Sequence, residues 1–478
     1  MTSKSLKTLL KSAGLAALTL LLATGAVAEA STLDCASFQI RDLGFEDLST
    51  LQAKLDGAVW VEIDDLLVAC GSPEALGTTG AASHQRWSDL SLDDLFVVRA
   101  AHPGSFSAED HGLALLARGG PFSIVQATSQ EARKFLDAGM LPHAPSGGHV
   151  GCGRPHVQPL MGRQVLARRS TNLERRGTTV FGPGAMDAVE AVDGARWLAD
   201  VTTLAGWNRY THGSEIDSAR DWLVTTFDAI PGLQVSTESF EVQGSVVENV
   251  LGVLPGTTRP DEWVIVGGHY DSISQNPSSA APGAEDNASG CAGVLELARV
   301  IAPMAPETTM IFMCYSGEEQ GLFGSRDHAG QLVTDGDTSK VQLMLNMDMI
   351  GYTGDAELDV LLETEPPYAG DLDPFVDAAT AFTTLQTVTS LFAFGSDHVP
   401  YLDRGMPAIL TIENDWDSYG SYHRTTDLPG NVSQDMGYQI LRMNAAVLAH
   451  VTGAQVTALF ENGFETGDTT GWSMVLGR

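Results

Sequence analysis

The sequence of 478 residues predicts an α/β protein with a mostly parallel central sheet sandwiched by helices, preceded by a smaller α+β domain at its N-terminus. Two observations lead to this prediction. From residue 188 onward, short apolar runs of strand length alternate with segments of helical periodicity, as in βαβ units. Before that point, strand-like and helix-like segments follow each other without regular alternation. The apolar share of 43% and the charged share of 18% suit a folded chain of two or more domains.

The first 28 residues have the pattern of a secretory signal peptide. Lys4, Lys7 and Lys11 form a basic start, an apolar run follows at 13–23, and small residues at 26–28 mark a cleavage point. The apolar run is too short to span a bilayer. We therefore expect a secreted protein, extracellular or periplasmic, without a membrane anchor.

The charge of the chain limits its partners. The formal net charge is −33, and the acid excess is spread along the chain rather than gathered in one tail. Such a surface repels phosphate backbones, so we expect no nucleic-acid partner. We also expect no membrane partner and a monomeric protein.

Five cysteines in an exported chain leave at least one thiol unpaired unless a bridge forms between chains. Cys35 and Cys70 could pair, but the sequence does not fix this. Cys291 and Cys314 lie in apolar segments near the candidate site, and we expect both to be buried, inert thiols.

Residues 29–162 show a mixed pattern without a recognised catalytic arrangement. Alternating segments predict strands at Val59–Ile63 and 122–126. A helix is predicted at 128–138, opened by a capping box and ended by glycine. The Gly/Pro-rich segment that follows contains four residues that could hold a metal in principle: His143, His149, Cys152 and His156. Their spacing matches no standard site, so an ordinary loop is the favoured interpretation.

An arginine-rich stretch at 163–187 interrupts the acidic chain. It contains Arg163, Arg168, Arg169, Arg175 and Arg176. A reversal of composition between two patterned regions predicts an exposed linker, and exposed linkers are where proteases cut. Together with the signal peptide, this favours a zymogen in which 29–162 is a pro-segment. The alternative is an accessory domain that stays attached.

Residues 188–453 form the predicted α/β domain. Helices are expected at 189–205, 217–230, 288–301 and 433–451, and strands at 233–242, Ser245–Leu254, 263–267, 310–315, 342–347 and 407–412. The remaining segment, 454–478, is Gly/Thr-rich and is predicted to be a tail outside the core.

Polar residues with metal-binding chemistry follow the ends of several of these strands. They are His269, Asp271, Asp286, Glu318, Glu319, Asp348 and His423. Because ligands bind at the carboxyl ends of the strands in open α/β folds, we expect these side chains to converge. Two imidazoles and three carboxylates provide the mixed ligation that suits zinc.

Two zinc ions can share five ligands if one carboxylate bridges them. Asp286 is the best bridge, because the helix N-terminus beside it favours an ionised carboxylate. The sequence therefore predicts His269, Asp286 and Asp348 on one ion, with Asp286, Glu319 and His423 on the other.

The adjacent Glu318 and Glu319 leave the end of a strand in different directions, so one can bind metal while the other moves protons. We assign Glu319 to the metal and Glu318 to the base. Asp271 is expected to accept a hydrogen bond from the far ring N–H of His269 and so to fix its tautomer.

Six segments carry a resemblance to a known family: HYDS, GAEDNASG, GEEQGLFGS, NMDMIGY, SDHVPY and YHRTTD, in this order. They resemble the co-catalytic two-zinc aminopeptidases of peptidase clan MH, of the leucyl type that bacteria secrete. The resemblance covers about 188–453. It implies the ligand roles given above, Glu318 as general base, a cis peptide after Asp286, and Tyr422 as a donor to the developing oxyanion.

The chain departs from this family at two positions. Some members carry arginine where this chain has Gly395, ahead of a signature at 396–398 that supports the site. That departure leaves open how the transition state is stabilised from that side. Many members carry a second aspartate where this chain has Asn287, a change that should keep the bridge.

The predicted function is a secreted zinc aminopeptidase that removes apolar N-terminal residues, using a zinc-bridging water activated by Glu318. Its substrates would be peptides or proteins with free N-termini. Trp416, Tyr419 and Tyr422 either line an apolar side-chain pocket or serve packing. The alternatives are a one-zinc glutaminyl cyclase-like enzyme and a catalytically inactive binding domain.

Overall fold

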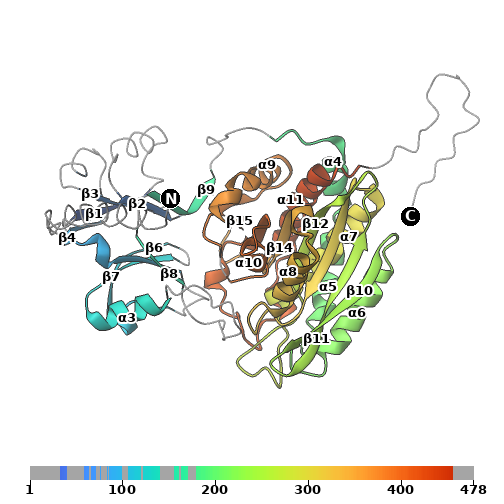
Figure 1. The fold of residues 1–478 in the computed structure, drawn as a ribbon, viewed down its shortest axis with the longest axis horizontal. Coiled ribbons are helices and arrows are strands. Elements are labelled where there is room, and N and C mark those ends of the chain that lie inside the picture. The colour runs from blue at the N-terminus through green and yellow to red at the C-terminus, as the bar shows by residue number, and fades with distance from the viewer. Residues whose placement is uncertain are drawn as a thin grey trace, which may run out of the picture.

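The computed structural model describes residues 179–455, except Phe394, and much of the chain from 33 to 170 (Figure 1). In the N-terminal part, the residues outside the description are 40–58, 64–65, 72–75, 77–82, 84, 100–105, 120–121, 140–155, 161–162 and 171–178. The predicted signal peptide at 1–28 and the tail beyond Gln455 also lie outside it.

The centre of the molecule is a mixed sheet whose middle strands run parallel. These are β12 (Arg259–His269), β13 (Thr308–Tyr315), β14 (Val341–Met347) and β17 (Ala408–Glu413). On one side, β10 (Gln234–Val242) and β11 (Ser245–Leu254) add an antiparallel hairpin next to β13. On the other, β15 (Asp359–Glu363) runs antiparallel to β17 and parallel to β16 (Gln386–Ser390). This is the predicted α/β sheet.

Helices cover both faces of this sheet, as predicted. They are α4 (Pro183–Ala191), α5 (Gly194–Leu204), α6 (Ile216–Asp228), α7 (Gly290–Ile301), α8 (Phe323–Asp335), α9 (Asp373–Phe382), α10 (Val399–Leu402) and α11 (Gln434–Thr452). Successive strand residues point to opposite faces. Val264 and Val266 therefore join the core under α5, α6, α7 and α11, whereas Ile265 packs with residues of α8 and α10.

The helix predicted at 189–205 is two helices, α4 and α5. Val192 has an extended conformation, and Asp193 then caps α5 by accepting hydrogen bonds from the backbone N–H groups of Ala195 and Arg196. The apolar periodicity continues through both helices, so hydrophobic pattern alone could not separate them. The Asp-Gly pair at 193–194 was the available signal for a new helix start.

The N-terminal part contributes strands to two sheets. β1 (Leu33–Gln39), β2 (Val59–Ile63), β3 (Leu66–Gly71) and β4 (Gln85–Leu90) extend the central sheet. β5 (Leu95–Arg99), β6 (Leu113–Gly119), β7 (Phe122–Ala127) and β8 (His156–Pro159) form a separate antiparallel sheet. Helix α3 (Gln130–Gly139) begins two residues later than predicted, because the hydroxyl of Ser129 rather than Thr128 accepts from the N–H of Ala132.

The first third of the predicted linker differs from the expectation. Arg163–Ser170 forms strand β9, which pairs parallel to β2 and antiparallel to β16, and so joins the two parts of the long sheet. In Figure 1, β9 lies between the N-terminal strands and the helix-covered domain. Strand pairing uses backbone groups, so a run of charged side chains does not prevent it. Arg175 and Arg176 lie outside the described residues.

Four of the five cysteines lie in the described part of the chain. A disulfide joins Cys35 to Cys70, which are direct partners on β1 and β3, so the pairing that the sequence left open is present. Cys291 and Cys314 are buried free thiols, as predicted, with their sulfurs 2.6 Å apart. Cys152 lies outside the described residues, as do His143 and His149.

Among the helices that the structure describes, none combines the length and the apolarity that crossing a membrane requires.

Candidate metal centre

The polar residues singled out in the sequence lie at the carboxyl ends of the parallel strands. His269 is the last residue of β12, Asp348 directly follows β14, and Glu318 and Glu319 lie in the turn after β13. Asp286 lies in the segment Ala284–Ser289, which leads into α7, and its own backbone is not helical. All of these side chains are buried, whereas His423, in the long loop after β17, keeps 22% of its side chain exposed.

His269, Asp286 and Asp348 form one potential metal-binding triad. The Nε2 atom of His269 lies 3.3 Å from Oδ1 of Asp286 and 3.5 Å from Oδ1 of Asp348. Ligand atoms around a tetrahedral zinc with bonds of about 2.0–2.1 Å lie about 3.3 Å apart. The spacing of this triad therefore suits a zinc ion.

Asp286, Glu319 and His423 form a second triad. The Nε2 atom of His423 lies 3.0 Å from Oδ2 of Asp286 and 3.0 Å from Oε2 of Glu319. Asp286 thus offers one oxygen to each triad, which is the geometry of a bridging carboxylate. The buried oxygen Asp348 Oδ1 accepts no hydrogen bond from the described residues. The two triads correspond to the ligand sets expected from the sequence.

Burial and repulsion between neighbouring carboxylates disfavour the charged forms of Glu318 and Glu319. Burial raises the pKa of Glu318 well above its ordinary value, and it raises that of Glu319 to about 7 against the pull of His423. Burial opposes ionisation of Asp286 too, but hydrogen bonds from His269 and His423 hold the pKa of that carboxyl below its ordinary range. Bound cations would lower the pKa values of these carboxyl groups, because a nearby positive charge favours the charged form of a carboxylate.

Glu318 lies beside the two triads that share Asp286. Its Oε2 atom is 3.9 Å from Nε2 of His269, and 5% of the residue is exposed. It can also form a group with His269 and Glu319. The two triads that share Asp286 draw their three carboxylates from other residues, so neither of them includes the Glu318 carboxylate.

Asp271 serves the site differently from the expectation. The ring Nδ1–H of His269 is closest to the backbone carbonyl of Asp271, at 3.1 Å, whereas the carboxylate is 3.6 Å away. The carboxylate instead accepts from the backbone N–H groups of Glu318, at 3.2 Å, and Glu319, at 3.3 Å. The hydroxyl of Thr211 also donates to it, at 2.9 Å. Asp271 therefore holds the turn that presents both glutamates.

Asp427 supports the backbone at Asp286, the candidate bridging residue, and was not recognised from the sequence. Its carboxylate accepts from the backbone N–H groups of Glu285, at 2.9 Å, and Asp286, at 3.0 Å, and from the hydroxyl of Tyr419, at 2.7 Å. It is the last residue of the YHRTTD motif. The motif therefore indicated that position 427 is important, but it did not indicate which groups Asp427 contacts.

Arg209 is a second support, and no motif in the sequence pointed to it. The side chain is fully buried and donates to the backbone carbonyls of Leu204, Tyr270, Pro282 and Gly283 at 2.5–2.7 Å. Burial lowers its pKa to about 10. Arg209 thus connects the segment after His269 to the segment before Asp286.

The peptide bond between Asp286 and Asn287 is cis, as expected. Asn287 is fully buried, and its amide donates to the carbonyl of Met347 while its side-chain oxygen accepts from the N–H groups of Gly290 and Met349. The sequon at 287–289 therefore cannot carry a glycan in the folded protein.

The aromatic residues near His423 divide into two groups. The ring of Tyr422 stacks on that of His423, with centroids 3.8 Å apart and an interplanar angle of 19°. Trp416 and Tyr419 are buried in a hydrophobic cluster, 6% and 3% exposed. Their burial agrees with the packing alternative rather than with an open side-chain pocket.

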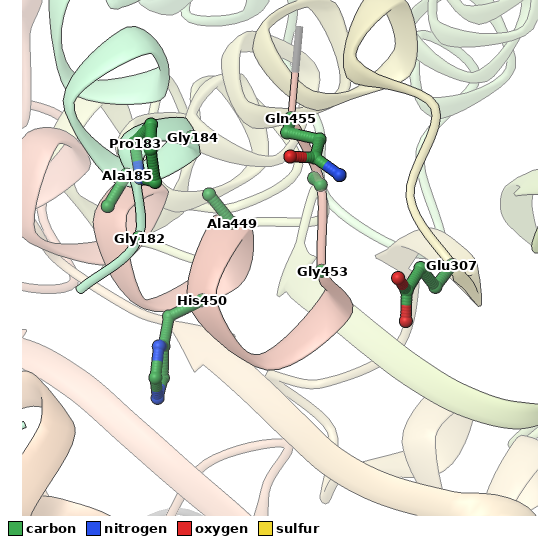
Figure 2. A pocket seen from close by; sticks show the side chains of 10 residues that line it. Gly182, Pro183, Gly184, Ala185, Glu307, Ala449, His450, Gly453 and Gln455 are labelled. Atoms are coloured by element: carbon green, nitrogen blue, oxygen red, sulfur yellow. The ribbon is translucent and has the colours of Figure 1, made fainter. Parts of the chain in front are cut away.

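A pocket of about 210 Å³ lies elsewhere, where the start of α4 meets the end of α11 (Figure 2). Glu307 and His450 are its titratable lining residues, and the rest of the lining is mainly glycine, alanine and proline. None of the lining residues belongs to either triad. The metal centre and this pocket are therefore separate features.

Residues 249–448 match the model of peptidase family M28. A relative named "probable zinc metalloprotease" from the fungus Leptosphaeria maculans is 32% identical over 258 residues, which cover 44% of this chain and 59% of the relative. The chain thus spans about three fifths of the length of that relative.

Two solved structures show the same fold. LapB from Legionella pneumophila matches 75% of this chain and 99% of its own, with a TM-score of 0.51 and 18% identity. Residues 179–478 make up less than two thirds of the chain, and the match covers 75% of it. The match therefore also includes residues before 179. A glutaminyl cyclase from Macrostomum lignano matches 59% of this chain and 97% of its own, with a TM-score of 0.50 and 20% identity.

Proposed function

We propose that this chain is a two-zinc aminopeptidase of peptidase family M28, whose model matches residues 249–448. The observation that carries the proposal is the pair of triads that share Asp286, with the Glu318 carboxylate beside them. Two metal ions and a neighbouring base are the groups that hydrolysis by an activated water molecule requires.

When bound, zinc supplies a Lewis acid and lowers the pKa of a water molecule at the site. Glu318 takes a proton from this water, which attacks the scissile carbonyl, and then returns the proton to the leaving amine. The raised pKa of the buried Glu318 carboxyl suits a group that both accepts and donates a proton. Tyr422, stacked on His423, is the proposed donor to the developing oxyanion.

Substrates with a free N-terminus fit the charge of the site. The buried carboxylates attract the cationic α-amino group of a peptide and hold it next to the first peptide bond. The proposed substrates are therefore peptides and proteins with free N-termini, and the leucyl-type resemblance favours apolar first residues.

Export of the protein is part of the proposal. The pattern of the first 28 residues supports it. The Cys35–Cys70 disulfide supports it independently, because disulfides form and persist mainly in oxidising compartments.

A glutaminyl cyclase remains the second candidate, because its fold is shared. A likeness at 20% identity concerns the fold alone and favours neither activity. The specific observation against a one-ion site is that both triads are complete in this chain.

The test is hydrolysis of leucine p-nitroanilide by the purified full chain, with elemental analysis of bound zinc. We expect about two zinc ions per chain, release of nitroaniline, loss of activity with a chelator, and recovery with added zinc. The matched control substrate is N-acetyl-leucine p-nitroanilide, which lacks the free amine and should not be cleaved. Cyclisation of N-terminal glutamine with one ion per chain, and no release of nitroaniline, would replace this proposal with the cyclase.

A further inference from the structure

The N-terminal domain meets the domain of the metal centre through a buried ion pair. Arg99 ends β5, and Glu363 ends β15. The two terminal nitrogens of Arg99 lie 3.0 and 3.1 Å from the two carboxylate oxygens of Glu363. Arg99 is 4% exposed and Glu363 is fully buried. A paired contact of this kind fixes the orientation of both side chains as well as their charge.

Further contacts surround this ion pair. Arg99 also donates to the backbone carbonyl of Phe392, at 3.2 Å. Phe122 lies opposite Arg99 in the β5–β7 pair, and its ring meets that of Phe392 edge to face, with centroids 5.7 Å apart. The contact is therefore a packed interface between the two domains and not a surface salt bridge.

A continuous set of contacts leads from this interface to a metal ligand. The Nε2 atom of His398 lies 3.4 Å from Glu363, and His398 is fully buried. Two residues earlier, the hydroxyl of Ser396 donates to Oδ2 of Asp348, at 2.5 Å. The amide of Asn346 donates to the same hydroxyl, at 2.8 Å. The short segment 396–398 thus touches Glu363 at one end and the ligand Asp348 at the other.

Removing Arg99 would leave the buried carboxylate of Glu363 without its guanidinium. Breaking a buried ion pair by removing one partner is strongly unfavourable, so Glu363 would move or draw in water. His398 would then lose a fixed neighbour, and the hydroxyl of Ser396 would lose its fixed position against Asp348. Partners of metal ligands set the geometry and basicity of those ligands.

We propose that Arg99 is a positioning residue of the metal centre, and that the N-terminal domain is for this reason a permanent part of the enzyme. Two alternatives were open for residues 29–162: a pro-segment that is removed, and an accessory domain that stays attached. The role proposed for Arg99 favours the attached domain. The inference rests on the zinc site of the proposed function.

The first experiment measures the rate at which zinc leaves the full-length protein for a coloured chelator. For Arg99→Met we expect release of one of the two ions to become about 10-fold faster, with a similar fall in kcat/KM. The control is Arg133→Met, because Arg133 pairs with Asp94 within the N-terminal domain and is about two-fifths exposed. The control should release zinc at the parent rate.

A paired variant covers the case in which Arg99→Met does not fold. In Arg99→Met/Glu363→Gln both members of the ion pair are neutral, so this variant should fold. It should still release zinc faster than the parent, because Arg99 no longer holds the segment that supports Asp348. A folded paired variant with the parent release rate and the parent kcat/KM overturns the inference.

A double-mutant cycle with Ser396→Ala separates positioning from a general loss of stability. If Arg99 acts through Ser396, the two substitutions should speed zinc release by less together than the product of their separate effects. Independent effects, which multiply, contradict this route. A parent protein that binds no zinc contradicts the proposed function itself. A parent that binds zinc, with variants that release it at the parent rate, contradicts only this inference.

Permanence of the domain is tested by cutting the full chain with trypsin in the region of Arg175 and Arg176 and then separating the products by gel filtration. We expect the N-terminal fragment to elute with the metal-binding fragment. A fully active metal-binding fragment that elutes alone overturns the claim of permanence.

Discussion

At the scale of single residues, one aspartate holds two adjacent glutamates in different surroundings. The carboxylate of Asp271 accepts from the backbone N–H groups of both Glu318 and Glu319 and thereby fixes the turn. Glu319 then reaches His423 and Asp286, whereas Glu318 lies beside His269. The different positions of the two carboxylates thus depend on hydrogen bonds to the backbone of the turn as well as on the side chains themselves.

The base is tested by Glu318→Gln, which keeps the shape of the side chain and removes its ability to accept a proton. We expect zinc content to equal that of the parent and kcat to fall by about 10²–10⁴-fold. Steady-state kinetics and elemental analysis measure the two quantities. Turnover close to that of the parent contradicts the assignment, and Glu319→Ala, which should lose metal, is the contrasting variant.

The turn is tested by Asp271→Asn, which turns one acceptor oxygen into a donor group facing backbone N–H groups. We expect zinc affinity to fall by about 10–100-fold, because the substitution misplaces Glu319. Competition with a chelator measures this affinity. Asp335→Asn, an exposed position on α8, is the matched control and should bind zinc like the parent. Equal zinc affinities in the two variants would contradict the role of Asp271 in holding the turn.

The sequence could predict the five candidate ligands, because they follow apolar strands whose ends meet at one edge of a sheet. It could not predict what holds them. Asp271 and Asp427 bond to backbone N–H groups, and Arg209 bonds to backbone carbonyls, which every residue possesses. A partner of that kind leaves no pattern in the sequence and emerges only when the fold brings the groups together.

At the scale of elements, the position of α7 against β14 depends on the absence of side chains. Gly290 is the first residue of α7, four residues after Asp286. A Cβ atom there would lie 2.2 Å from the carbonyl oxygen of Met347 and 2.5 Å from the side-chain oxygen of Asn287. The helix that follows the bridging aspartate can approach the sheet this closely only with glycine at its start.

Gly290→Ala should therefore destabilise the protein by about 1–3 kcal/mol, because α7 must move away from β14. Urea denaturation measures the change. The control is Gly330→Ala, in the interior of α8, where the nearest atom to an added Cβ is 3.9 Å away. That control should be neutral or stabilise by up to about 1 kcal/mol through helix propensity. A loss of stability that is equal in both variants would contradict the close-approach argument.

Long, strongly patterned elements could be predicted, and short or charged ones could not. β10, β11 and α11 begin and end within a residue or two of the expected positions. β15 and β16 have only five residues each and were not predicted, because such short runs resemble loops. β9 was predicted as a linker because of its arginines, yet it pairs on both sides through its backbone.

At the scale of the whole molecule, the metal centre joins segments that are distant in the chain. The five candidate ligands span 269–423 and come from separate strands and loops. The unfolded chain cannot present them together, so zinc should bind the folded state preferentially and stabilise it.

Removal of zinc by a chelator should therefore lower the melting temperature of the full chain. At a free zinc concentration of 100 times Kd, one site alone contributes about 2.7 kcal/mol to the free energy of unfolding. Calorimetry with chelator, and then with zinc restored, measures the shift. Glu318→Gln should show the same shift as the parent, because it keeps the metal ligands. An unchanged melting temperature after complete removal of zinc would contradict the expectation.

Strand β9 has a consequence for the solubility of the protein. It now pairs with β16 through Arg168, Arg169 and Ser170. If the chain were cut and everything before 179 lost, β16 would become the outer strand of the sheet, with backbone N–H and C=O groups facing water. Such an edge is a template for pairing with another chain. The shortened molecule would then self-associate as its concentration rises, so the N-terminal domain also protects the protein from aggregation.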